Sequence, residues 1–376
     1  MKAEIGQLMS DEQAMKLAIE QAQRGFGHVE PNPPVGCVIL DKNSQFLASG
    51  YHHTYGKAHA EVDALSKVSK AELRGARVYI TLEPCAHHGK TPPCATRLAS
   101  LPVSEVFYGV KDPNPLVSGQ GIAILREARI KVSQLSSMVE DCEELAETFL
   151  YTHREKAPFI ALKVASSIDG QIGLSSGESK WITNELSREF SHHLRARYEA
   201  VLIGANTFLK DNPKLNVRLK EFENKQNKVV VVSGSGRVLS ELKDSNLLSC
   251  RNPNNVFVLV GQNAKVNDAF AREIGVQVVR VEEKNGTLTS QNISKSLFNM
   301  GVRSIFVEGG ATVYSTFLSQ SCVQRLYCFV APKIIGSTNG LSWTKDLNIS
   351  NLNENLRLKS VRIRSFHNDV LITSRF

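Results

Sequence analysis

Three residues with the chemistry of metal ligands constrain the fold of this chain more than any other feature. His59 is followed two residues later by Glu61, and the cysteines Cys85 and Cys94 come further along the chain. A histidine and two thiolates can occupy three corners of a tetrahedral zinc site and leave the fourth for water. Glu61 is then placed to move protons for that water without ligating the metal. The fold therefore has to bring separated points of the chain together.

The spacing of apolar residues predicts a layered α/β domain for the first half of the chain. Short apolar runs and helical stretches alternate at 12–24, 35–40, 60–68, 77–82, 105–110 and 139–154. Asp11 is the expected N-cap of the first helix. We expect His59 and Glu61 to open one helix, and Cys85 to open another after the strand at 77–82. Their side chains would then meet at the strand ends, where helix N-termini favour thiolates.

A second alternation of strands and helices begins at Phe159, after a junction at 155–158. Strands are expected at 159–165, 200–203, 228–233, 256–261, 276–281, 304–307 and 326–330, and helices at 184–196, 267–274, 290–300 and 311–318. A terminal strand pair is expected at 359–365 and 369–373. The sequence thus predicts two α/β domains, one over 1–153 and the other over 158–376.

The composition is that of a soluble globular protein, with 42% hydrophobic and 22% charged residues among 376. No apolar run approaches the roughly 18 residues that span a bilayer. The N-terminal segment Met1–Gly6 lacks the apolar stretch of a signal peptide. The seven cysteines are scattered, which argues against a disulfide scaffold. We therefore expect a cytoplasmic protein that does not associate with membranes.

The net charge of +8 is unevenly divided between the two halves. Residues 1–150 hold 15 Lys and Arg against 18 Asp and Glu, whereas the remainder holds 30 against 19. A basic second half suits anionic, phosphate-bearing ligands, and on charge alone it suits nucleic acid equally well. Charge does not decide between these two classes of partner.

The segment between the two cysteines has an unusual length for a zinc nucleobase deaminase. Such deaminases usually carry Pro-Cys-x-x-Cys, whereas here eight residues separate Cys85 from Cys94. The intervening His87, His88 and Lys90 can form a cationic pocket for a phosphate, or simply a solvated polar loop. The two histidines are also metal-ligand types. We prefer Cys94 as the third ligand because its thiolate completes the deaminase set.

Two glycine-containing loops of the second half can cradle a phosphate. Val307–Thr312 (VEGGAT) follows an expected strand and opens an expected helix, where backbone N–H groups suit an anion. Ser233–Arg237 (SGSGR) is either an anion-binding turn or a flexible one. Neither loop has the G-x-G-x-x-G fingerprint, so a tight strand-to-helix turn stays an open alternative for the first.

Four segments closely resemble the deaminase domain of the bacterial bifunctional riboflavin-biosynthesis deaminase/reductase family: Pro31–Ile39, His59–Glu61, Thr81–Cys94 and Asp112–Pro115. The resemblance implies a cytidine-deaminase-like α/β/α domain. In it, one Zn²⁺ is held by His59, Cys85 and Cys94, and the catalytic proton shuttle is Glu61. It further implies that the pyrimidine ring meets Asn32. Ribose or phosphate contacts are implied for His88, Lys90, Asp112 and Asn114.

Six further segments resemble the reductase domain of the same family: 163–170, 176–183, 204–207, 211–215, 307–310 and 331–336. The resemblance implies a fold similar to dihydrofolate reductase, with NADPH as cofactor. Cofactor contacts are implied for Ala165, Trp181, Thr207, Asp211, Gly234, Gly309, Gly310, Ala311, Thr312, Val313, Tyr314 and Ser315. Substrate contacts are implied for Ser179, Arg195, Leu215, Arg218 and Glu308, with the two arginines as phosphate clamps. Ser233 stands where the family often has an acidic residue.

The resemblance implies two consecutive steps of riboflavin synthesis on a small phosphorylated pyrimidine, without a nucleic-acid partner. The first is hydrolytic deamination of 2,5-diamino-6-ribosylamino-4(3H)-pyrimidinone 5′-phosphate, and the second is NADPH reduction of its ribosyl group to ribityl. The alternative from another class is a tRNA deaminase with a basic RNA-binding second domain, although aromatic residues are sparse over 210–251. A further alternative keeps only one domain active. The sequence is compatible with a homo-oligomer.

Overall fold

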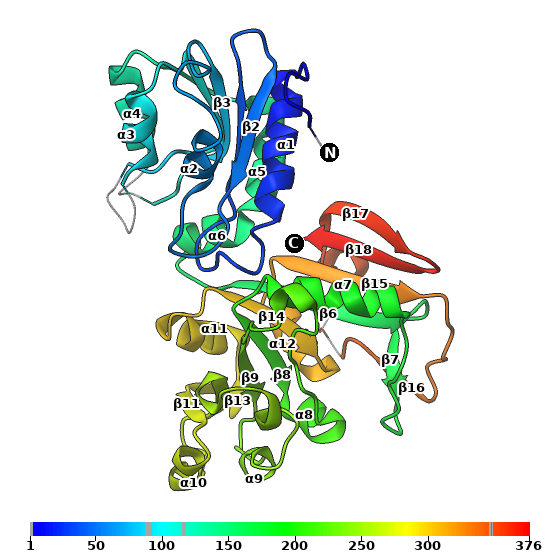
Figure 1. Cartoon of the computed structure of the whole chain (residues 1–376). Coiled ribbons are helices and arrows are strands. Elements are labelled where there is room, and N and C mark those ends of the chain that lie inside the picture. Colours follow the sequence, from blue (N-terminus) through cyan, green and yellow to red (C-terminus); the bar gives the residue numbers. More distant parts are fainter. Residues whose placement is uncertain (1–2, 87–91, 115–117, 346, 348) are drawn as a thin grey trace. The chain divides into compact units, whose positions relative to one another are not determined.

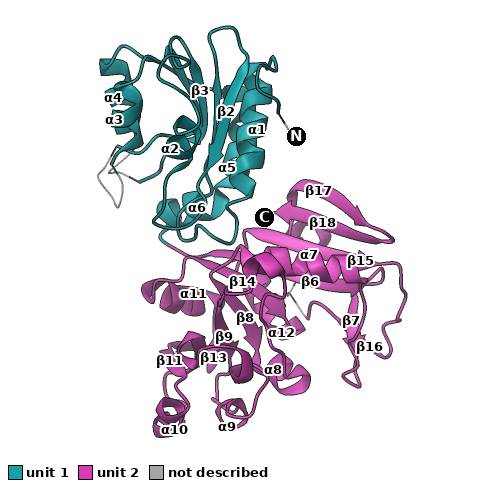
Figure 2. Cartoon of the chain, viewed as in Figure 1, with its two compact units in different colours: residues 1–156 teal, residues 157–376 magenta. Residues whose placement is uncertain are grey.

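The computed structural model describes residues 3–86, 92–114, 118–345, 347 and 349–376. The chain divides into two compact units, Met1–Lys156 and Ala157–Phe376, which are coloured separately in Figure 2. Each unit has its own sheet and its own hydrophobic clusters, so each is described by itself. Among the described residues, no helix has the length and apolar character needed to cross a membrane.

Unit 1 is a five-stranded sheet with helices on both faces. Its elements are α1 (Asp11–Gln23), β1 (Gly36–Leu40), β2 (Phe46–Tyr51), α2 (Ala60–Leu65), β3 (Arg77–Leu82), α3 (Cys94–Ala99), β4 (Glu105–Val110), α4 (Gln120–Glu127), β5 (Lys131–Gln134), α5 (Val139–Leu145) and α6 (Glu147–Glu155). The strand order is β2-β1-β3-β4-β5. Strand β1 runs antiparallel to β2 and β3, whereas β3, β4 and β5 are parallel.

Two hydrophobic clusters make unit 1 a three-layer structure. Helices α1 and α5 pack on one face of the sheet, and α2, α3 and α4 pack on the other (Figure 1). All five residues of β1 are buried between these layers, which explains why this strand reads as an unbroken apolar run. Gly36 permits the close approach of α1, since a Cβ there would lie 1.8 Å from the Ala18 carbonyl oxygen. The expected α/β layering is confirmed.

Two helix starts in unit 1 differ from the sequence prediction. Ser10, not Asp11, caps α1, because its hydroxyl accepts a hydrogen bond from the Gln13 N–H while the Gln13 side chain binds back. The Asp11 carboxylate instead accepts hydrogen bonds from Arg77 and Tyr79. Helix α3 begins at Cys94, so it is the second cysteine, not Cys85, that opens a helix.

Unit 2 is built around a nine-stranded sheet. Its elements are β6 (Phe159–Ser167), β7 (Gln171–Leu174), α7 (Glu185–Ala196), β8 (Ala200–Gly204), α8 (Ala205–Asp211), β9 (Lys228–Val232), α9 (Leu239–Leu242), β10 (Val256–Gly261), α10 (Asp268–Glu273), β11 (Gln277–Val281), β12 (Glu283–Lys284), β13 (Thr287–Leu288), α11 (Ser290–Asn299), β14 (Ser304–Gly309), α12 (Ala311–Ser319), β15 (Arg325–Ala331), β16 (Gly340–Ser342), β17 (Lys359–Phe366) and β18 (Asp369–Arg375).

The strand order of the large sheet is β11-β10-β9-β8-β14-β6-β15-β18-β17. Pairing is parallel from β11 to β15, and the last two strands are antiparallel additions. Helices α11 and α12 cover one face, and α8, α9 and α10 cover the other. Because the parallel strands end at a common edge, the loops after β8, β9 and β14 open toward one place, the usual ligand site of such sheets.

Candidate active sites

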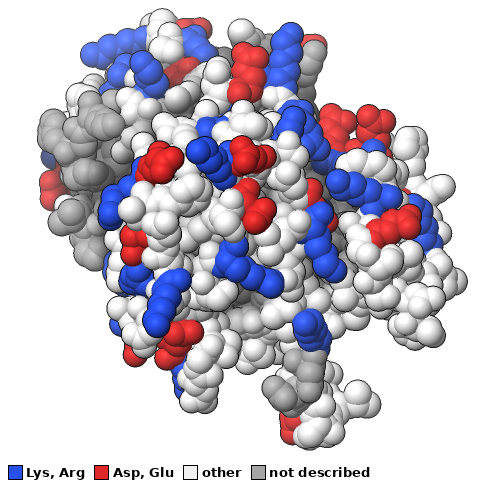
Figure 3. Space-filling view, turned by 90° about the horizontal axis from the view of Figure 1, so that it is seen from below, with Lys and Arg blue, Asp and Glu red and all other residues white. Residues whose placement is uncertain are grey.

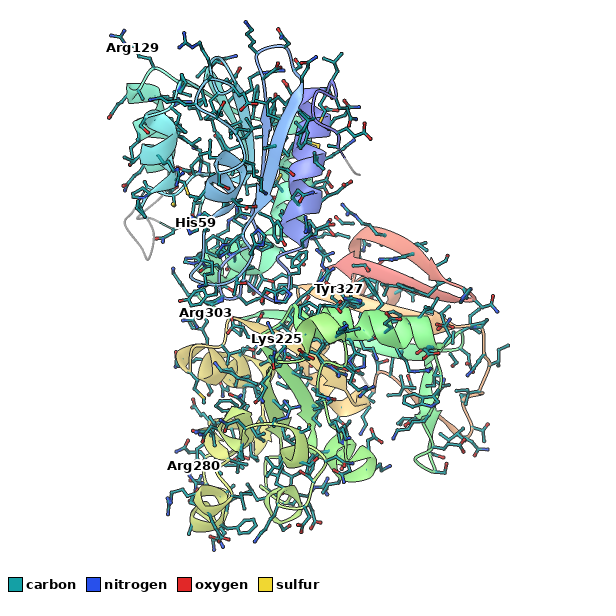
Figure 4. All side chains as sticks on the ribbon, in the orientation of Figure 1. His59, Arg129, Lys225, Arg280, Arg303 and Tyr327 are labelled. Atoms are coloured by element: carbon teal, nitrogen blue, oxygen red, sulfur yellow. The ribbon has the colours of Figure 1, made fainter. Side chains whose placement is uncertain are left out.

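The predicted metal ligands of unit 1 converge on one point. His59 is the N-cap residue of α2, Cys94 is the first residue of α3, and Cys85 follows β3. The Nδ1 atom of His59 lies 3.5 Å from the Cys85 Sγ and 3.4 Å from the Cys94 Sγ. All three ligand atoms lie within 4.8 Å of one another, at the His59 position labelled in Figure 4.

These separations fit a tetrahedral zinc ion. Zinc bonds of ordinary length to nitrogen and sulfur place such ligand atoms about 3.6 Å apart. The hydrogen bonding of Cys85 also fits a zinc ligand. The Cys94 N–H donates to the Cys85 Sγ at 3.3 Å, which favours the thiolate that zinc binds. The hydrogen bond from Cys94 and that from His59 lower the pKa of the Cys85 thiol to about 4, whereas the hydrogen bond to Cys85 and burial raise the pKa of Cys94. A dication at this point would replace the proton that the two sulfurs share.

Glu61 lies beside this set in the first turn of α2. Its side chain is buried, and it shares a cavity of about 370 Å³ with His59 and Cys85. Burial, followed by the charge of Cys85, raises the pKa of the Glu61 carboxyl. A carboxyl group whose pKa is raised takes up a proton more readily and can release it again during one reaction cycle.

Other predicted contacts line the same cavity. Asn32, Asp112 and Asn114 all contribute to its wall, and the Asn114 N–H donates to the Asp112 carboxylate at 2.8 Å. The predicted phosphate contacts His88 and Lys90 lie outside the described residues.

Several wall residues of this cavity were missed by the sequence reasoning, Glu83 and His52 among them. Glu83 accepts hydrogen bonds from the N–H groups of Asp112, at 3.3 Å, and Gly119, at 3.1 Å. It thereby ties the loop after β4 to the metal-binding segment. His52 is held by the Ala58 carbonyl oxygen, 2.9 Å from its Nδ1. The position of Glu83 directly before Pro84 and Cys85 was the available signal, whereas no pattern marked His52.

Unit 2 has a larger cavity, of about 820 Å³, at the carboxyl ends of β8, β9 and β14. Eleven of the twelve predicted cofactor contacts line it: Ala165, Trp181, Thr207, Asp211, Gly234, Gly309, Gly310, Ala311, Thr312, Val313 and Tyr314. Ser315 does not, since it is buried and its hydroxyl accepts a hydrogen bond from the Lys345 N–H. Ser233 is also buried, and its hydroxyl has no hydrogen-bond partner among the residues that the structure describes.

The glycine pair at the start of α12 fits a dinucleotide phosphate. A Cβ at Gly310 would lie 3.0 Å from the Thr207 hydroxyl, so a side chain here would fill the space above the helix N-terminus. Gly310 is the N-cap of this nine-residue helix and offers no side-chain cap. The first N–H groups of α12 are therefore available to an anion, which suits the pyrophosphate of NADPH.

The predicted substrate contacts of unit 2 fall into two groups. Ser179, Arg195, Arg218 and Glu308 line the cavity. Leu215 does not, because its side chain is buried in the cluster formed by β8, β9 and β10. The contact between Leu215 and the substrate stays a prediction, and it would have to be made by backbone atoms of Leu215.

Arg195 is engaged within the protein. Its Nε and Nη2 donate to the two carboxylate oxygens of Glu308, at 2.5 Å and 2.9 Å, and its Nη1 donates to the Asn216 carbonyl oxygen at 2.5 Å. Both side chains of this ion pair are about nine-tenths buried. Burial alone raises the pKa of Glu308, but Arg195 outweighs it, so the net pKa is lowered. The binding of a substrate phosphate by Arg195 therefore stays a prediction. Few N–H groups of Arg195 are left to donate to a phosphate.

Lys163 and His192 also line this cavity and were missed by the sequence reasoning. Burial lowers the pKa of Lys163, opposed by the charge of Glu308. Lys163 opens the segment 163–170 that carries the family resemblance, but the sequence reasoning assigned it no role, and His192 lies in the middle of a helix outside any motif. The segment 163–170 was the available signal for Lys163, whereas His192 could have been found only from the packing of α7.

Comparison with known proteins accounts for both units. Residues 8–110 match the cytidine and deoxycytidylate deaminase zinc-binding region, and residues 158–372 match the RibD C-terminal domain. The chain belongs to the RibD family of riboflavin biosynthesis proteins. The riboflavin biosynthesis protein RibD of Actinobacillus pleuropneumoniae is 35% identical over 97% of this chain and 95% of its own length. That of Escherichia coli is 35% identical over 88% of this chain.

Solved RibD structures share the architecture over nearly the whole chain. Acinetobacter baumannii RibD has a TM-score of 0.84 at 34% identity, covering 97% of this chain and 98% of its own. A Thermotoga maritima protein described as a diaminohydroxyphosphoribosylaminopyrimidine deaminase and 5-amino-6-(5-phosphoribosylamino)uracil reductase has a TM-score of 0.80 at 34% identity.

The expected family, fold class and enzyme type are thus confirmed. This RibD family member is a bifunctional riboflavin-biosynthesis enzyme, with a cytidine-deaminase-like zinc unit and a reductase unit of the NADPH-dependent type. The second half, which the tRNA alternative had assigned to RNA binding, matches the RibD C-terminal domain instead. On the face seen in Figure 3, Lys and Arg side chains are interspersed with Asp and Glu.

Proposed function

We propose that unit 1 deaminates 2,5-diamino-6-ribosylamino-4(3H)-pyrimidinone 5′-phosphate and that unit 2 then reduces the ribosyl group of the product to ribityl. The presence of both cavities in one chain carries this proposal, because each has the donor set that one of the two reactions needs. The Thermotoga maritima relative, whose description names both reactions, supports it. The substrate is a small phosphorylated molecule in both steps.

In the deaminase cavity, a zinc ion held by His59, Cys85 and Cys94 would lower the pKa of a bound water. Glu61 would take the proton of that water at its carboxylate and deliver it to the departing amine. Asn32, on the same cavity wall, would orient the pyrimidine ring. The Glu83 carboxylate would keep the Asp112 loop in place during turnover.

In the reductase cavity, NADPH would supply a hydride. The electrophilic atom that would accept it is C1′ of the ring-opened ribosylamine in its Schiff-base form. The residues after β14 would fix the cofactor through the N-terminus of α12. Glu308 and Lys163 line the same cavity, where an anion and a cation can orient the sugar hydroxyls. No protein nucleophile is required.

The test is an incubation of the purified protein with the diaminopyrimidine phosphate, with and without NADPH. We expect ammonia to be released without NADPH, and NADPH to be oxidised only after deamination. Release of ammonia from tRNA, with no turnover of the small substrate, would refute the proposal.

We further infer that the protein works in the cytoplasm, as its seven free cysteines, two of them in the metal set, suit a reducing compartment. A homo-oligomer is supported by β17, a sheet edge on which Val361 and Ile363 are exposed. Light scattering on the purified protein would measure the mass of the particle, and the mass of a single chain would refute the oligomer.

A further inference from the structure

His192 lies in the middle of α7 with one ring nitrogen fully occupied. Its Nδ1 is 3.3 Å from the Arg195 Nη1 and 3.4 Å from the backbone nitrogen of Arg218. A guanidinium and a backbone amide can only donate hydrogen bonds. The Nδ1 atom is therefore an acceptor for both, and the ring proton must reside on Nε2.

The surroundings keep this imidazole neutral. Burial, followed by the positive charges of Arg195 and Arg218, lowers the pKa of His192 to about 3. Protonation of Nδ1 would also place its hydrogen against the two N–H groups that donate to this atom. Near neutral pH His192 is therefore a fixed hydrogen-bond donor through Nε2–H, with no capacity to accept there.

The free edge of the ring faces the reductase cavity. His192 lines that cavity, and within the described part of the chain its Nε2 has no hydrogen-bond partner. This nitrogen is also not among the buried side-chain atoms that lack a partner, so solvent reaches it. Because the rest of the residue is buried, the Nε2–H is the part of His192 that a ligand can touch.

Arg218 supplies the neighbouring charge. Its guanidinium makes no hydrogen bond or ion pair to the described residues, and burial lowers its pKa, followed by the charge of Arg195. Arg195 itself is committed to Glu308 and to the Asn216 carbonyl oxygen. Arg218 is therefore the freer of the two arginines predicted to hold the substrate phosphate.

We propose that His192 binds the phosphorylated ribosyl chain of the reductase substrate, donating its Nε2–H to a substrate oxygen beside Arg218. This assignment rests on the proposed reductase function and adds a binding residue to it. A neutral donor suits this position, because a further cation next to Arg195, Arg218 and Lys163 would be repelled by all three when the site is empty. The histidine adds a directed hydrogen bond without adding charge.

Two isosteric substitutions separate the two nitrogens of the ring. The amide nitrogen of glutamine can take the place of Nε2, whereas the amide of asparagine takes the place of Nδ1. His192→Gln therefore keeps a donor toward the substrate and loses the acceptor for Arg195 and Arg218. His192→Asn keeps an acceptor for those groups and loses the donor toward the substrate.

The experiment measures the reductase KM for the deaminated substrate and the Kd for NADPH in both variants. The expected result is a KM raised about ten- to a hundred-fold in His192→Asn, with largely restored binding in His192→Gln and an unchanged NADPH Kd in both. His193→Asn and His193→Gln are the matched controls. His193 is the half-exposed neighbour of His192 on the same helix, and its Nδ1 lies 3.6 Å from the Glu221 Oε1. A dephosphorylated substrate shows which substrate oxygen accepts the hydrogen bond from His192. The difference in KM between His192→Asn and His192→Gln disappears if that oxygen belongs to the phosphate and persists if it belongs to a hydroxyl group.

The opposite pattern, with His192→Asn equal to wild type and His192→Gln impaired, would assign the residue a purely structural role through Nδ1. Equal KM values in all variants would also overturn the proposal. The tautomer is tested without turnover by nitrogen-detected NMR of histidine-labelled protein, with His192→Gln to assign the signal, and a proton found on Nδ1 would contradict the assignment. Failure of the wild type to reduce the substrate would instead refute the proposed function.

Discussion

The buried ion pair between Arg195 and Glu308 gives the most quantitative prediction. Arg195→Met keeps an unbranched side chain as far as the position of Nε. It removes the two hydrogen bonds to the Glu308 carboxylate and the one to the Asn216 carbonyl oxygen. Both side chains are about nine-tenths buried, so the remaining carboxylate has little access to water. Breaking such a pair on one side typically costs about 3–5 kcal/mol of unfolding free energy.

The expected change is large enough to measure by calorimetry. Unit 2 spans Ala157–Phe376, and for a domain of that size each kcal/mol shifts Tm by about 2–4 °C. Arg195→Met should therefore lower the Tm of the reductase transition by about 6–20 °C. Deaminase activity measured at low temperature serves as the control, because neither residue belongs to unit 1.

The pH dependence of the same variant has a definite sign. The lowered pKa of Glu308 means that the wild-type pair contributes stability above the unfolded-state pKa of glutamate, and this is lost as pH falls through the folded-state value. In Arg195→Met, burial acts without its main opposing cation, so the Glu308 pKa should rise above its unfolded value. Stability is then lost as pH rises, and the Tm gap to wild type should widen from acid to neutral pH.

A double variant tests whether the charge is responsible. Arg195→Met with Glu308→Leu replaces both charges by apolar groups, which is often neutral or stabilising for buried pairs. We expect it to recover more than half of the Tm lost in Arg195→Met. A single variant that loses less than about 1 kcal/mol, or a double variant that is no better than the single one, would refute this account of the pair.

Three further variants test the two active sites. Cys94→Ser should lose zinc and deaminase activity while still reducing deaminated substrate. The control is Cys250→Ser, which replaces a half-buried thiol far from the metal set in sequence and should retain zinc. Full zinc content in Cys94→Ser, measured by elemental analysis, would contradict the ligand set. Glu61→Gln should keep zinc but release ammonia about 10²–10⁴-fold more slowly, and near-wild-type release would exclude it as proton shuttle. Gly310→Val should weaken NADPH binding about tenfold or more in a fluorescence titration, because its Cβ would crowd the Thr207 hydroxyl, and an unchanged Kd would place the cofactor elsewhere.

The central strands and the metal set were predictable from the sequence for a physical reason. Strand β10 (Val256–Gly261) was predicted with its observed bounds because a strand buried on both faces leaves an unbroken apolar run. The metal set was predictable because few residue types ligate zinc. Convergence of His59 with Cys94 then required only that α2 and α3 begin at the same edge of the sheet.

The parts that were not predictable depend on tertiary contacts. Helices α3 and α8 have six and seven residues, too few for a periodic pattern, and they form by packing on the sheet. The misassigned cap at Asp11 follows from its partners Arg77 and Tyr79, which are distant in sequence. His192 was missed because a single histidine on a helix carries no signal until Arg195 and Arg218 are seen at its Nδ1.

The central claim is that one chain carries out both reactions in order, and one comparison tests it most directly. Wild type and Glu61→Gln are each given the diaminopyrimidine phosphate with NADPH, and ammonia and oxidised NADPH are measured in the same sample. We predict equal amounts of ammonia and oxidised NADPH from wild type, and almost none of either from Glu61→Gln. Adding deaminated substrate to Glu61→Gln should then restore the oxidation of NADPH alone. Oxidation of NADPH by Glu61→Gln at the wild-type rate, without release of ammonia, would contradict the account.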